Sequence, residues 1–440
     1  MKEIYIKDLV LGQKTNLYCW IANKRQIKNN LFVDVYDSTG KLECYASAEI
    51  TQNYDELCKL NRESCVSLFG ELVQTDKKQE FKVLSFEVFS HSTLTISPYP
   101  NETNFNVIDE KHARQVIEHP TFYIRNRDLS MLFYIKAVFK RQLQNYLWDK
   151  GFVEFESPTL TRQTLYEDKG AIWLERDGQK LSLSRCATFH LEPALVSYEK
   201  LFTITNSHAD ERVKTNRHLI EYMHLKAEMA WFTLDELIEF AKNLYYECAK
   251  RTYEICKKEF DYWVGEEQMK QKLDVLNPKN HKMVTYDEAV EILKKYNVEF
   301  EYGKSLTTKQ EQIITKHFGE CFVWVKYIPY TVEGFMFKRK KDNDFFTMTC
   351  DLIAPNGFGE ILGTAEKMTD YDEIISSMEQ KGKMEHFARY KDYAELHKLG
   401  LPPHGGIGMG VERAVRYLVD ITHVKYLKPF AVVNNSQINH

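Results

Sequence analysis

His208-Ala-Asp-Glu-Arg-Val-Lys-Thr-Asn-Arg-His-Leu-Ile-Glu-Tyr222 is the stretch that decides how the larger part of this chain folds. Two strand-like arms flank it, Leu201–Ser207 and Leu219–Ala227, so the pattern predicts an antiparallel hairpin. The hairpin would bring Glu211 and Arg217 near its mouth, where an arginine can bind phosphate in a fork geometry that lysine cannot match. The residues alone leave two interpretations open, a phosphate-binding hairpin and a solvated hairpin tip.

A second stretch, Asp351-Leu-Ile-Ala-Pro-Asn-Gly-Phe-Gly-Glu360, carries two carboxylates around a strong turn signal. We expect Asp351 and Glu360 on neighbouring strands, facing one another. Magnesium in proteins is usually held by one or two carboxylates together with substrate phosphates. The alternative is a solvent-exposed hairpin with ordinary acidic residues.

The third stretch is His404-Gly-Gly-Ile-Gly-Met-Gly-Val-Glu-Arg413. Gly408 and Gly410 leave one face of a strand open to a flat ligand, and Arg413 follows at the start of a helix. The spacing fits neither a Walker A loop nor the dinucleotide-binding glycine pattern.

Around these stretches the chain reads as strands with inserted helices. Helical periodicity covers Leu129–Lys150, and capping boxes at Thr233-Leu-Asp-Glu236 and Thr285-Tyr-Asp-Glu288 open two more helices. The runs expected to form strands are Phe152–Glu156, Cys321–Lys326, Thr347–Ile353 and Gly359–Leu362. This order predicts an α+β domain.

The first ninety residues instead predict a small β-barrel of the OB type. Its five expected strands are Asn16–Ile21, Leu31–Tyr36, Leu42–Ala46, Cys65–Leu72 and Phe81–Phe89, with a turn at Asp37-Ser-Thr-Gly40. We therefore expect a barrel over 1–95, a linker over 96–120 and the α+β domain over 121–440, with a helical insertion at about 233–320.

Composition narrows the class of protein. With 59 basic and 63 acidic residues, the net charge of −4 argues against a protein that coats DNA by bulk charge. No apolar run reaches about 18 residues, Met1-Lys-Glu-Ile-Tyr-Ile-Lys lacks the apolar segment of a signal peptide, and the nine cysteines form no CxxC pair. A soluble, cytoplasmic protein with no membrane partner and buried free thiols is expected.

The order of the three stretches resembles the class II (subclass IIb) aminoacyl-tRNA synthetases, most closely the asparaginyl type. Gly151-Phe-Val-Glu-Phe-Glu-Ser-Pro158 is similar to motif 1 of that family, Phe202 to Tyr222 to motif 2, and Gly408-Met-Gly-Val-Glu-Arg413 to motif 3. The resemblance implies an antiparallel sheet with flanking helices that binds ATP and Mg²⁺ and activates a small amino acid as an aminoacyl-adenylate. It also implies a homodimer and an OB-fold that binds the anticodon of a tRNA.

The resemblance gives each site residue a role. Arg217 would meet the γ-phosphate, while Tyr222 and Arg413 would cover the two faces of adenine. The implied catalytic residues are Glu211, Arg217 and Arg413; the implied ATP-binding residues are Arg217, His218, Glu221, Tyr222, Glu360 and Arg413; the implied metal ligands are Asp351 and Glu360.

The chain departs from the family pattern at several of these places. Ala209 stands where the family has the motif 2 arginine that steadies the α-phosphate, and Arg212 can replace it only if the hairpin loop is remodelled. In the amino-acid pocket, formed with His404, Thr188 stands at a glutamine and Lys367 at an arginine. Lysine lacks the planar fork of arginine, so the pocket is expected to differ.

The barrel has one departure too. Arg25 and Phe32 fit the family's anticodon-binding pattern, and Phe32 is the expected base-stacking aromatic, but Glu43 stands where a glutamine usually contacts the anticodon.

Three functions remain open on the sequence. One is a divergent asparaginyl-type enzyme with altered amino-acid or acceptor specificity, and the second is an orthodox asparagine–tRNA ligase. The third is an inactive homologue that binds RNA or regulates another protein.

Overall fold

The computed structural model describes residues 2–76, 78–93, 120–164, 170–210 and 215–433. The chain divides into two compact units, Met1–Glu102 and Thr103–His440, and each is described by itself. The expected linker over 96–120 lies outside the described residues, apart from Pro120 at the start of α3.

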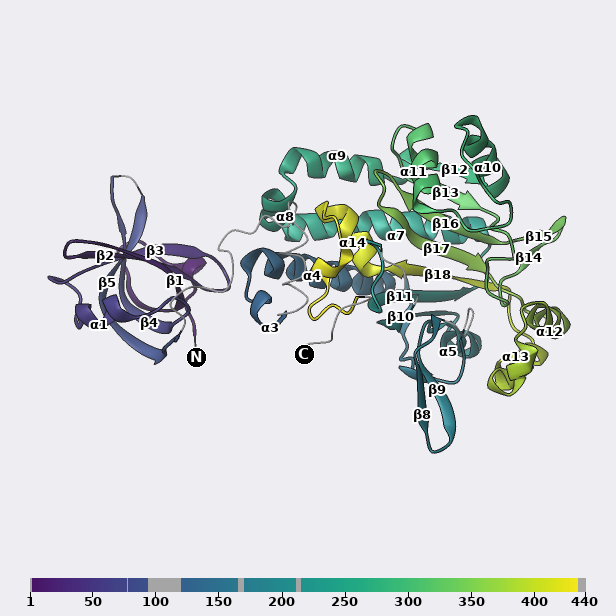
Figure 1. Cartoon of the computed structure of the whole chain (residues 1–440), viewed down its shortest axis with the longest axis horizontal. Coiled ribbons are helices and arrows are strands. Elements are labelled where there is room, and N and C mark those ends of the chain that lie inside the picture. The colour runs from purple at the N-terminus through teal and green to yellow at the C-terminus, as the bar shows by residue number, and fades with distance from the viewer. Residues whose placement is uncertain (1, 77, 94–119, 165–169, 211–214, 434–440) are drawn as a thin grey trace. The chain divides into compact units, whose positions relative to one another are not determined.

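The first unit is a closed five-stranded barrel with the strand order β1-β2-β3-β5-β4 (Figure 1). Its elements are β1 (Lys14–Ile27), β2 (Asn30–Tyr36), β3 (Lys41–Ser47), α1 (Tyr54–Lys59), β4 (Cys65–Gln74) and β5 (Gln79–Ser90). All five expected strands are confirmed, because alternate apolar side chains from each of them fill one buried core.

The Asp37 turn is confirmed as well. Its Oδ1 accepts hydrogen bonds from the amides of Thr39 and Gly40 at 2.7 and 3.2 Å, and Oδ2 accepts from Lys2 and from the amide of Ile6. Burial alone would raise the pKa of this carboxyl, but these donors lower it below its usual value.

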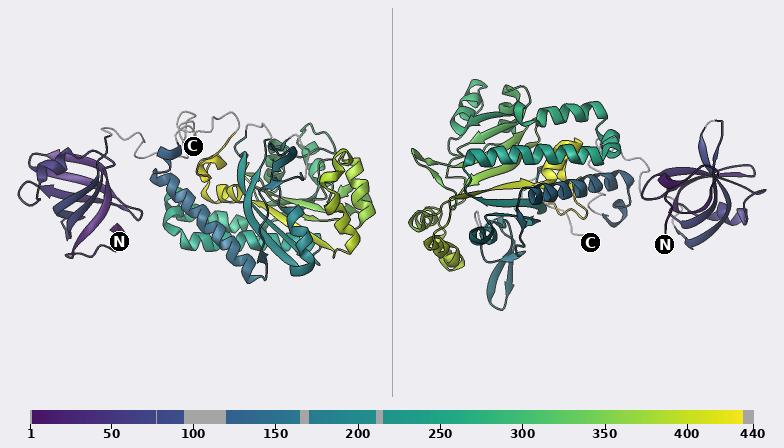
Figure 2. Two further views of the ribbon diagram at one scale, coloured as in Figure 1. Left: turned by 90° about the horizontal axis from the view of Figure 1, so that it is seen from below. Right: turned by 180° about the vertical axis from the view of Figure 1, so that it is seen from behind.

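The second unit is built on an eight-stranded, mostly antiparallel sheet with the order β12-β13-β16-β17-β18-β11-β10-β6 (Figures 1 and 2). The strands of this sheet are β6 (Val153–Glu154), β10 (Lys200–His208), β11 (Glu221–Ala230), β12 (Lys282–Thr285), β13 (Val323–Lys326), β16 (Thr349–Ala354), β17 (Gly359–Glu366) and β18 (His404–Gly410). Two small sheets accompany it, one of β7 (Leu160–Thr161), β8 (Trp173–Arg176) and β9 (Gln179–Leu183), the other of β14 (Arg339–Lys340) and β15 (Asn343–Thr347). The α+β class expected from the sequence is confirmed.

The helices of this unit begin with α3 (Pro120–Tyr123), α4 (Arg127–Asp149), α5 (Thr188–Leu191), α6 (Leu195–Tyr198) and α7 (Leu234–Ile255). They continue with α8 (Lys257–Trp263), α9 (Glu266–Leu276), α10 (Tyr286–Lys295), α11 (Thr308–His317), α12 (Tyr371–Gln380), α13 (Lys391–Leu396) and α14 (Val411–Val419). Both predicted capping boxes are present: the Thr233 and Thr285 hydroxyls accept from the third helical amides, and Glu236 and Glu288 accept in return.

The two faces of the main sheet differ in chemistry, and this positions the site. On β11 the side chains of Leu225, Ala227 and Met229 join the core that α4, α7 and α14 cover. Alternation turns the even-numbered side chains, from Tyr222 to Glu228, to the opposite face. That second face is polar, and it carries the candidate site.

Several strand boundaries differ from the expectation, and tertiary pairing explains two of the differences. The run Thr347–Ile353 is divided at Met348, because β15 pairs with β14 while β16 joins the main sheet between β13 and β17. The second arm of the hairpin begins at Glu221 rather than Leu219, since only the Ala209 amide continues the pairing, to the Ile220 carbonyl.

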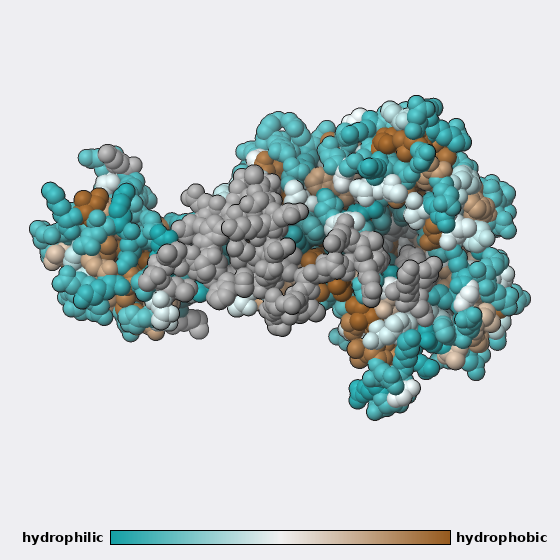
Figure 3. Space-filling model, viewed as in Figure 1, coloured by the Kyte–Doolittle hydropathy of each residue, from teal (hydrophilic) through white to brown (hydrophobic). Residues whose placement is uncertain are grey.

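No helix of the described residues is long and apolar enough to cross a membrane. On the face seen in the space-filling view, hydrophilic residues predominate among the coloured residues and apolar residues form scattered patches (Figure 3).

Candidate active site

Arg217, Glu360 and Arg413 lie together at one end of the polar face, although the sequence separates them widely. Arg413 stands in the first turn of α14, directly after the strand β18. Its Nη1 lies 3.3 Å from Glu360 Oε2 and donates to the Glu360 carbonyl at 3.2 Å, while Nε donates to the Arg217 carbonyl at 3.3 Å. Desolvation raises the pKa of Glu360, but Arg413 and then Arg217 outweigh it and hold that pKa below its usual value.

A cavity opens beside this group. Arg217, His218, Tyr222 and Arg413 line it, and so does Ala209, the residue at the position of the family's motif 2 arginine. Burial, Arg413 and Arg217 lower the pKa of His218 to about 4, so its imidazole is neutral at pH 7. The cavity therefore combines two guanidinium groups, a neutral imidazole and an aromatic ring, which suits the phosphates and base of a nucleotide.

The remaining predicted ATP-binding residue, Glu221, is placed differently. Glu221 is absent from the described lining of the cavity; its Oε1 accepts from Lys428 Nζ at 3.2 Å and from the Asn206 amide. Glu211 and Arg212 lie outside the described residues, so their predicted roles stay predictions.

Carboxylates crowd the strands next to the cavity. Asp351 on β16 and Glu360 on β17 lie on neighbouring strands as expected, but they are not register partners, because Asp351 pairs with Gly363 and Glu360 with Ile353. Burial, Glu360 and Glu333 together raise the pKa of Asp351 well above its usual value. Glu311, from α11, accepts from Arg217 Nη1 at 2.6 Å.

These acids suit a divalent cation. Among the described residues no group of three or more metal-binding side chains is assembled. Magnesium needs only one or two carboxylates when substrate phosphates complete its shell. Asp351 and Glu360 stand on neighbouring strands and offer two carboxylates, so they fit the metal role predicted for them.

At the other end of the same strands lies a buried charged cluster around Lys367. Lys367 Nζ lies 2.6 Å from Glu192 Oε1 and 2.5 Å from Glu228 Oε1, and all three side chains are at most 2% exposed. Tyr393 donates to Glu192 Oε2 at 2.7 Å, and His404 Nε2 lies 3.8 Å from that oxygen. Burial alone would lower the pKa of Lys367, but the two carboxylates outweigh it and raise that pKa.

Thr188 belongs to the same cluster, as its predicted pocket role requires. Its hydroxyl donates to Glu228 Oε1 at 3.1 Å and is within 3.1 Å of the Cys186 thiol. Glu228 Oε2 is buried and has no hydrogen-bond partner among the described residues. It faces the backbone of Gly406, where a Cβ would collide with it.

Sequence reasoning missed Glu192, Glu228 and Tyr393. Strand alternation is the signal that could have found Glu228, because Tyr222 and Glu228 are an even number of residues apart on one strand. Glu192 and Tyr393 meet only through tertiary structure, and no local pattern announces them.

The predicted RNA-binding residues lie on the outer face of the barrel. Strand pairing aligns Arg25, Phe32 and Tyr45 in one row across β1, β2 and β3. The Arg25 guanidinium stands 5.1 Å from the Phe32 ring centroid, and the Phe32 and Tyr45 rings are 5.6 Å apart. Glu43, two residues before Tyr45 on β3, forms an ion pair with Lys78. Aromatic and guanidinium planes of this kind stack unpaired bases.

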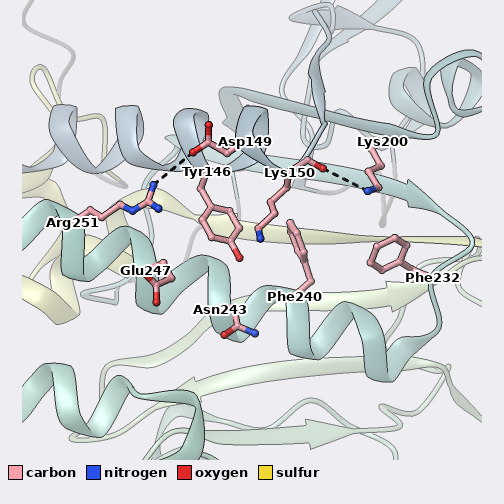
Figure 4. Close-up of a pocket in the computed structure, with 9 residues that line it drawn as sticks. All are labelled: Tyr146, Asp149, Lys150, Lys200, Phe232, Phe240, Asn243, Glu247 and Arg251. Atoms are coloured by element: carbon pink, nitrogen blue, oxygen red, sulfur yellow. Dashed lines mark hydrogen bonds and ion pairs between the residues drawn. The ribbon is translucent and has the colours of Figure 1, made fainter.

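A second cavity, of about 630 Å³, lies elsewhere, between the C-terminal end of α4 and the helix α7. Side chains such as Tyr146 and Glu247 line it from the two helices (Figure 4). The polar contacts drawn there are an ion pair of 3.8 Å between Arg251 and Asp149, and a bond of 3.5 Å from Lys200 to the Lys150 carbonyl. It lies on the helix-covered side of the sheet and shares no residue with the site described above.

Comparison with known proteins agrees with this architecture. The family model of class II tRNA synthetases (D, K and N) matches residues 113–434, and that of the OB-fold nucleic acid binding domain matches 17–89. The asparagine–tRNA ligases of Thermococcus kodakarensis and Pyrococcus horikoshii are each 26% identical to this chain, with 97% of it covered and 97% and 96% of their own lengths.

Solved structures share the fold. Asparaginyl-tRNA synthetase from Pyrococcus horikoshii, complexed with asparaginyl-adenylate, superposes with a TM-score of 0.90 at 24% identity over 99% of both chains. The Entamoeba histolytica asparaginyl-tRNA synthetase gives a TM-score of 0.84 at 21% identity over 98% of both. The family match covers most of the chain, so this protein is a ligase of the aminoacyl-tRNA synthetase type that belongs to the class II tRNA synthetases (D, K and N) and is similar to the asparaginyl enzymes.

Proposed function

We propose that this asparaginyl-tRNA synthetase-like enzyme uses Mg²⁺ and ATP to activate a small amino acid other than asparagine as an aminoacyl-adenylate. One observation carries the proposal. The end of the polar face that holds Arg217 and Arg413, which we call the nucleotide end, keeps its cations and acids. At the opposite end, which we call the acid end, Lys367 is held between two buried carboxylates.

The nucleotide end supports ATP binding. Arg217 and Arg413 supply fixed positive charge, and Tyr222 offers a flat surface for the base. Glu311 holds the Arg217 guanidinium at 2.6 Å, so that its position is fixed before a phosphate arrives. Asp351 and Glu360 would hold Mg²⁺, which supplies neutralisation of phosphate charge when it is bound.

The acid end supports a changed specificity. An arginine in this place would present a planar fork to a substrate amide or carboxylate, whereas Lys367 has one point charge that already faces Glu192 and Glu228. The buried Glu228 Oε2 has no hydrogen-bond partner among the described residues, so it can accept a hydrogen bond from a substrate. The pocket therefore favours a side chain with an N–H or O–H donor and disfavours a second carboxylate.

We further propose that the acceptor is a tRNA, that the chain forms a homodimer and that it works in the cytoplasm. The row formed by Arg25, Phe32 and Tyr45 supports RNA binding. The homodimer rests on the resemblance of residues 151–158 to motif 1. All nine cysteines are free, as is usual in a reducing compartment.

The test is amino-acid-dependent exchange of pyrophosphate into ATP, measured with each proteinogenic amino acid and with small diamino and hydroxy acids, followed by charging of total tRNA. Exchange with one of the donor-bearing acids, and none with asparagine, supports the proposal. Exchange and charging with asparagine would establish the orthodox ligase instead. Silence with every acid while tRNA still binds would indicate the inactive RNA-binding homologue.

A further inference from the structure

Lys226 lies in the middle of the polar face, on the central strand β11. Its neighbours across the sheet are Thr203 on β10 and Gly408 on β18. A Cβ on Gly408 would collide with Lys226 Nζ and lie 3.3 Å from His224 Nε2, so both nitrogen atoms stand over that glycine. The absence of a side chain at Gly408 is what leaves room for this cation.

The ammonium group of Lys226 has no counter-ion among the described residues. Four other well-buried lysines of this unit each lie within 3.2 Å of a carboxylate; these pairs are Lys136–Glu412, Lys272–Asp420, Lys326–Asp235 and Lys367 with its two glutamates. A half-buried cation without a partner is costly, and such groups gather where a ligand supplies the missing charge.

The nearest polar group beside Lys226 is the imidazole of His224, which does not carry negative charge. Burial, Lys226 and Arg413 lower the pKa of His224 well below its usual value, so this imidazole is neutral. Its Nδ1 is bonded to the Ser207 hydroxyl at 3.0 Å, which leaves Nε2 directed toward Gly408. Lys226 and His224 thus form a positive, donor-rich patch over the glycine floor.

The patch lies between the two halves of the site. Along β11, Lys226 is four residues from Tyr222 at the nucleotide end and two from Glu228 at the acid end, which is roughly 13 Å and 7 Å at the rise of a strand. A nucleotide at one end and an acid at the other would meet over Lys226. This step rests on the function proposed above.

We propose that Lys226 is a catalytic residue whose ammonium group contacts both the α-phosphate of ATP and the carboxylate that attacks it. A carboxylate oxygen forms the new bond to the α-phosphorus, and the bond from that phosphorus to the bridging oxygen breaks as pyrophosphate leaves with the electron pair. No proton is transferred in this step. It reduces the repulsion between two anions and supplies the charge that the family's arginine would bring at Ala209.

The α-phosphate contact can be tested without knowing the acid. Binding of adenosine and of AMP to the full chain is measured by titration calorimetry for the wild type, Lys226→Met, Lys226→Arg and the control Lys282→Met, whose side chain is exposed on β12. We expect Lys226→Met to weaken AMP binding about tenfold or more and to leave adenosine binding unchanged, because only AMP carries the phosphate. Lys226→Arg should recover most of the loss, and Lys282→Met should behave as the wild type.

The second arm measures pyrophosphate exchange with whichever acid the wild type activates. Lys226→Met should lower the rate by about 10²–10³, the usual effect of removing one preorganised charge donor. Equal AMP affinity in the wild type and Lys226→Met would overturn the assignment of Lys226 even if exchange is present. A wild type that binds AMP through Lys226 but exchanges with no acid would instead refute the proposed function and leave the phosphate contact standing.

Discussion

Replacing Lys367 with methionine should destabilise the second unit strongly, because it leaves two buried carboxylates without their positively charged partner. Glu192 and Glu228 are 0% and 2% exposed at their side chains, and Lys367 Nζ is the cation within 2.6 Å of both. Breaking such a buried pair costs about 3–5 kcal/mol, whereas methionine keeps most of the lysine stem and its packing. At 1.36 kcal/mol per factor of ten, the unfolding equilibrium constant should rise roughly 10²–10⁴-fold.

A matched control is available on the same sheet. Lys326 is 11% exposed and contacts Asp235 at 2.6 Å, but Asp235 is 77% exposed, so water can solvate that carboxylate once the lysine is gone. Lys326→Met should therefore cost about 1 kcal/mol or less. Urea unfolding followed by tryptophan fluorescence suits the comparison, since five of the six tryptophans belong to the second unit.

The pH dependence separates charge from packing. In the wild type burial would raise the pKa of Glu192, but Lys367 and then His404 outweigh it and hold that pKa below its usual value. That stability is present above the unfolded pKa of about 4.3 and is lost as the pH falls through the lower folded pKa. In Lys367→Met the main charge that opposes burial is gone, so the pKa of Glu192 rises relative to the wild type and the variant's deficit narrows as the pH falls from 7 to 5.

Equal losses for Lys367→Met and Lys326→Met would refute this reasoning. So would a Lys367→Met deficit that stays constant between pH 7 and pH 5, because packing loss does not titrate.

The remaining predictions concern the nucleotide end and the barrel. Arg413→Ala should reduce ATP-dependent exchange by about 10²–10³ while the melting temperature stays within a few degrees of the wild type; unchanged exchange would contradict the site assignment. Ala209→Arg should raise exchange in a Lys226→Met chain but not in the wild type, and a fall in both would show that the new side chain only crowds the cavity. His218, with a pKa of about 4, should keep the neutral imidazole signals in an NMR titration from pH 8 to pH 5, with His218→Asn identifying its resonances. Phe32→Ala should weaken binding of total tRNA about tenfold or more without altering exchange, because base stacking on an aromatic ring is lost; equal binding would remove the barrel face from the RNA contact.

Local patterns predicted much of this fold. Apolar and polar residues alternate along the barrel strands. In the capping boxes at Thr233 and Thr285, all the residues that form the reciprocal hydrogen bonds lie within four consecutive positions. The division at Met348 could not be predicted in this way, because it depends on which neighbour each half of the run finds.

Site residues that belong to contiguous sequence motifs could be predicted. Those that meet only as buried ion pairs between distant segments could not. Arg217 and Arg413 could be named from their motifs, and the structure places them together. The meeting of Lys367 with Glu192 and Glu228, which lie 175 and 139 positions away along the sequence, follows only from the strand order. No pattern of hydropathy or residue spacing within a short stretch of the sequence indicates this contact.

The strand β17 runs from the proposed nucleotide end to the proposed acid end of the site, with Glu360 near its first residue and Lys367 just past its last. Seven residues of strand separate the two by roughly 23 Å, well beyond the 7–10 Å within which substitutions usually influence one another. Changes at the acid end should then combine additively with changes at the nucleotide end. Such a layout lets the choice of acid drift, in evolution or in the laboratory, while the machinery that consumes ATP is inherited unaltered.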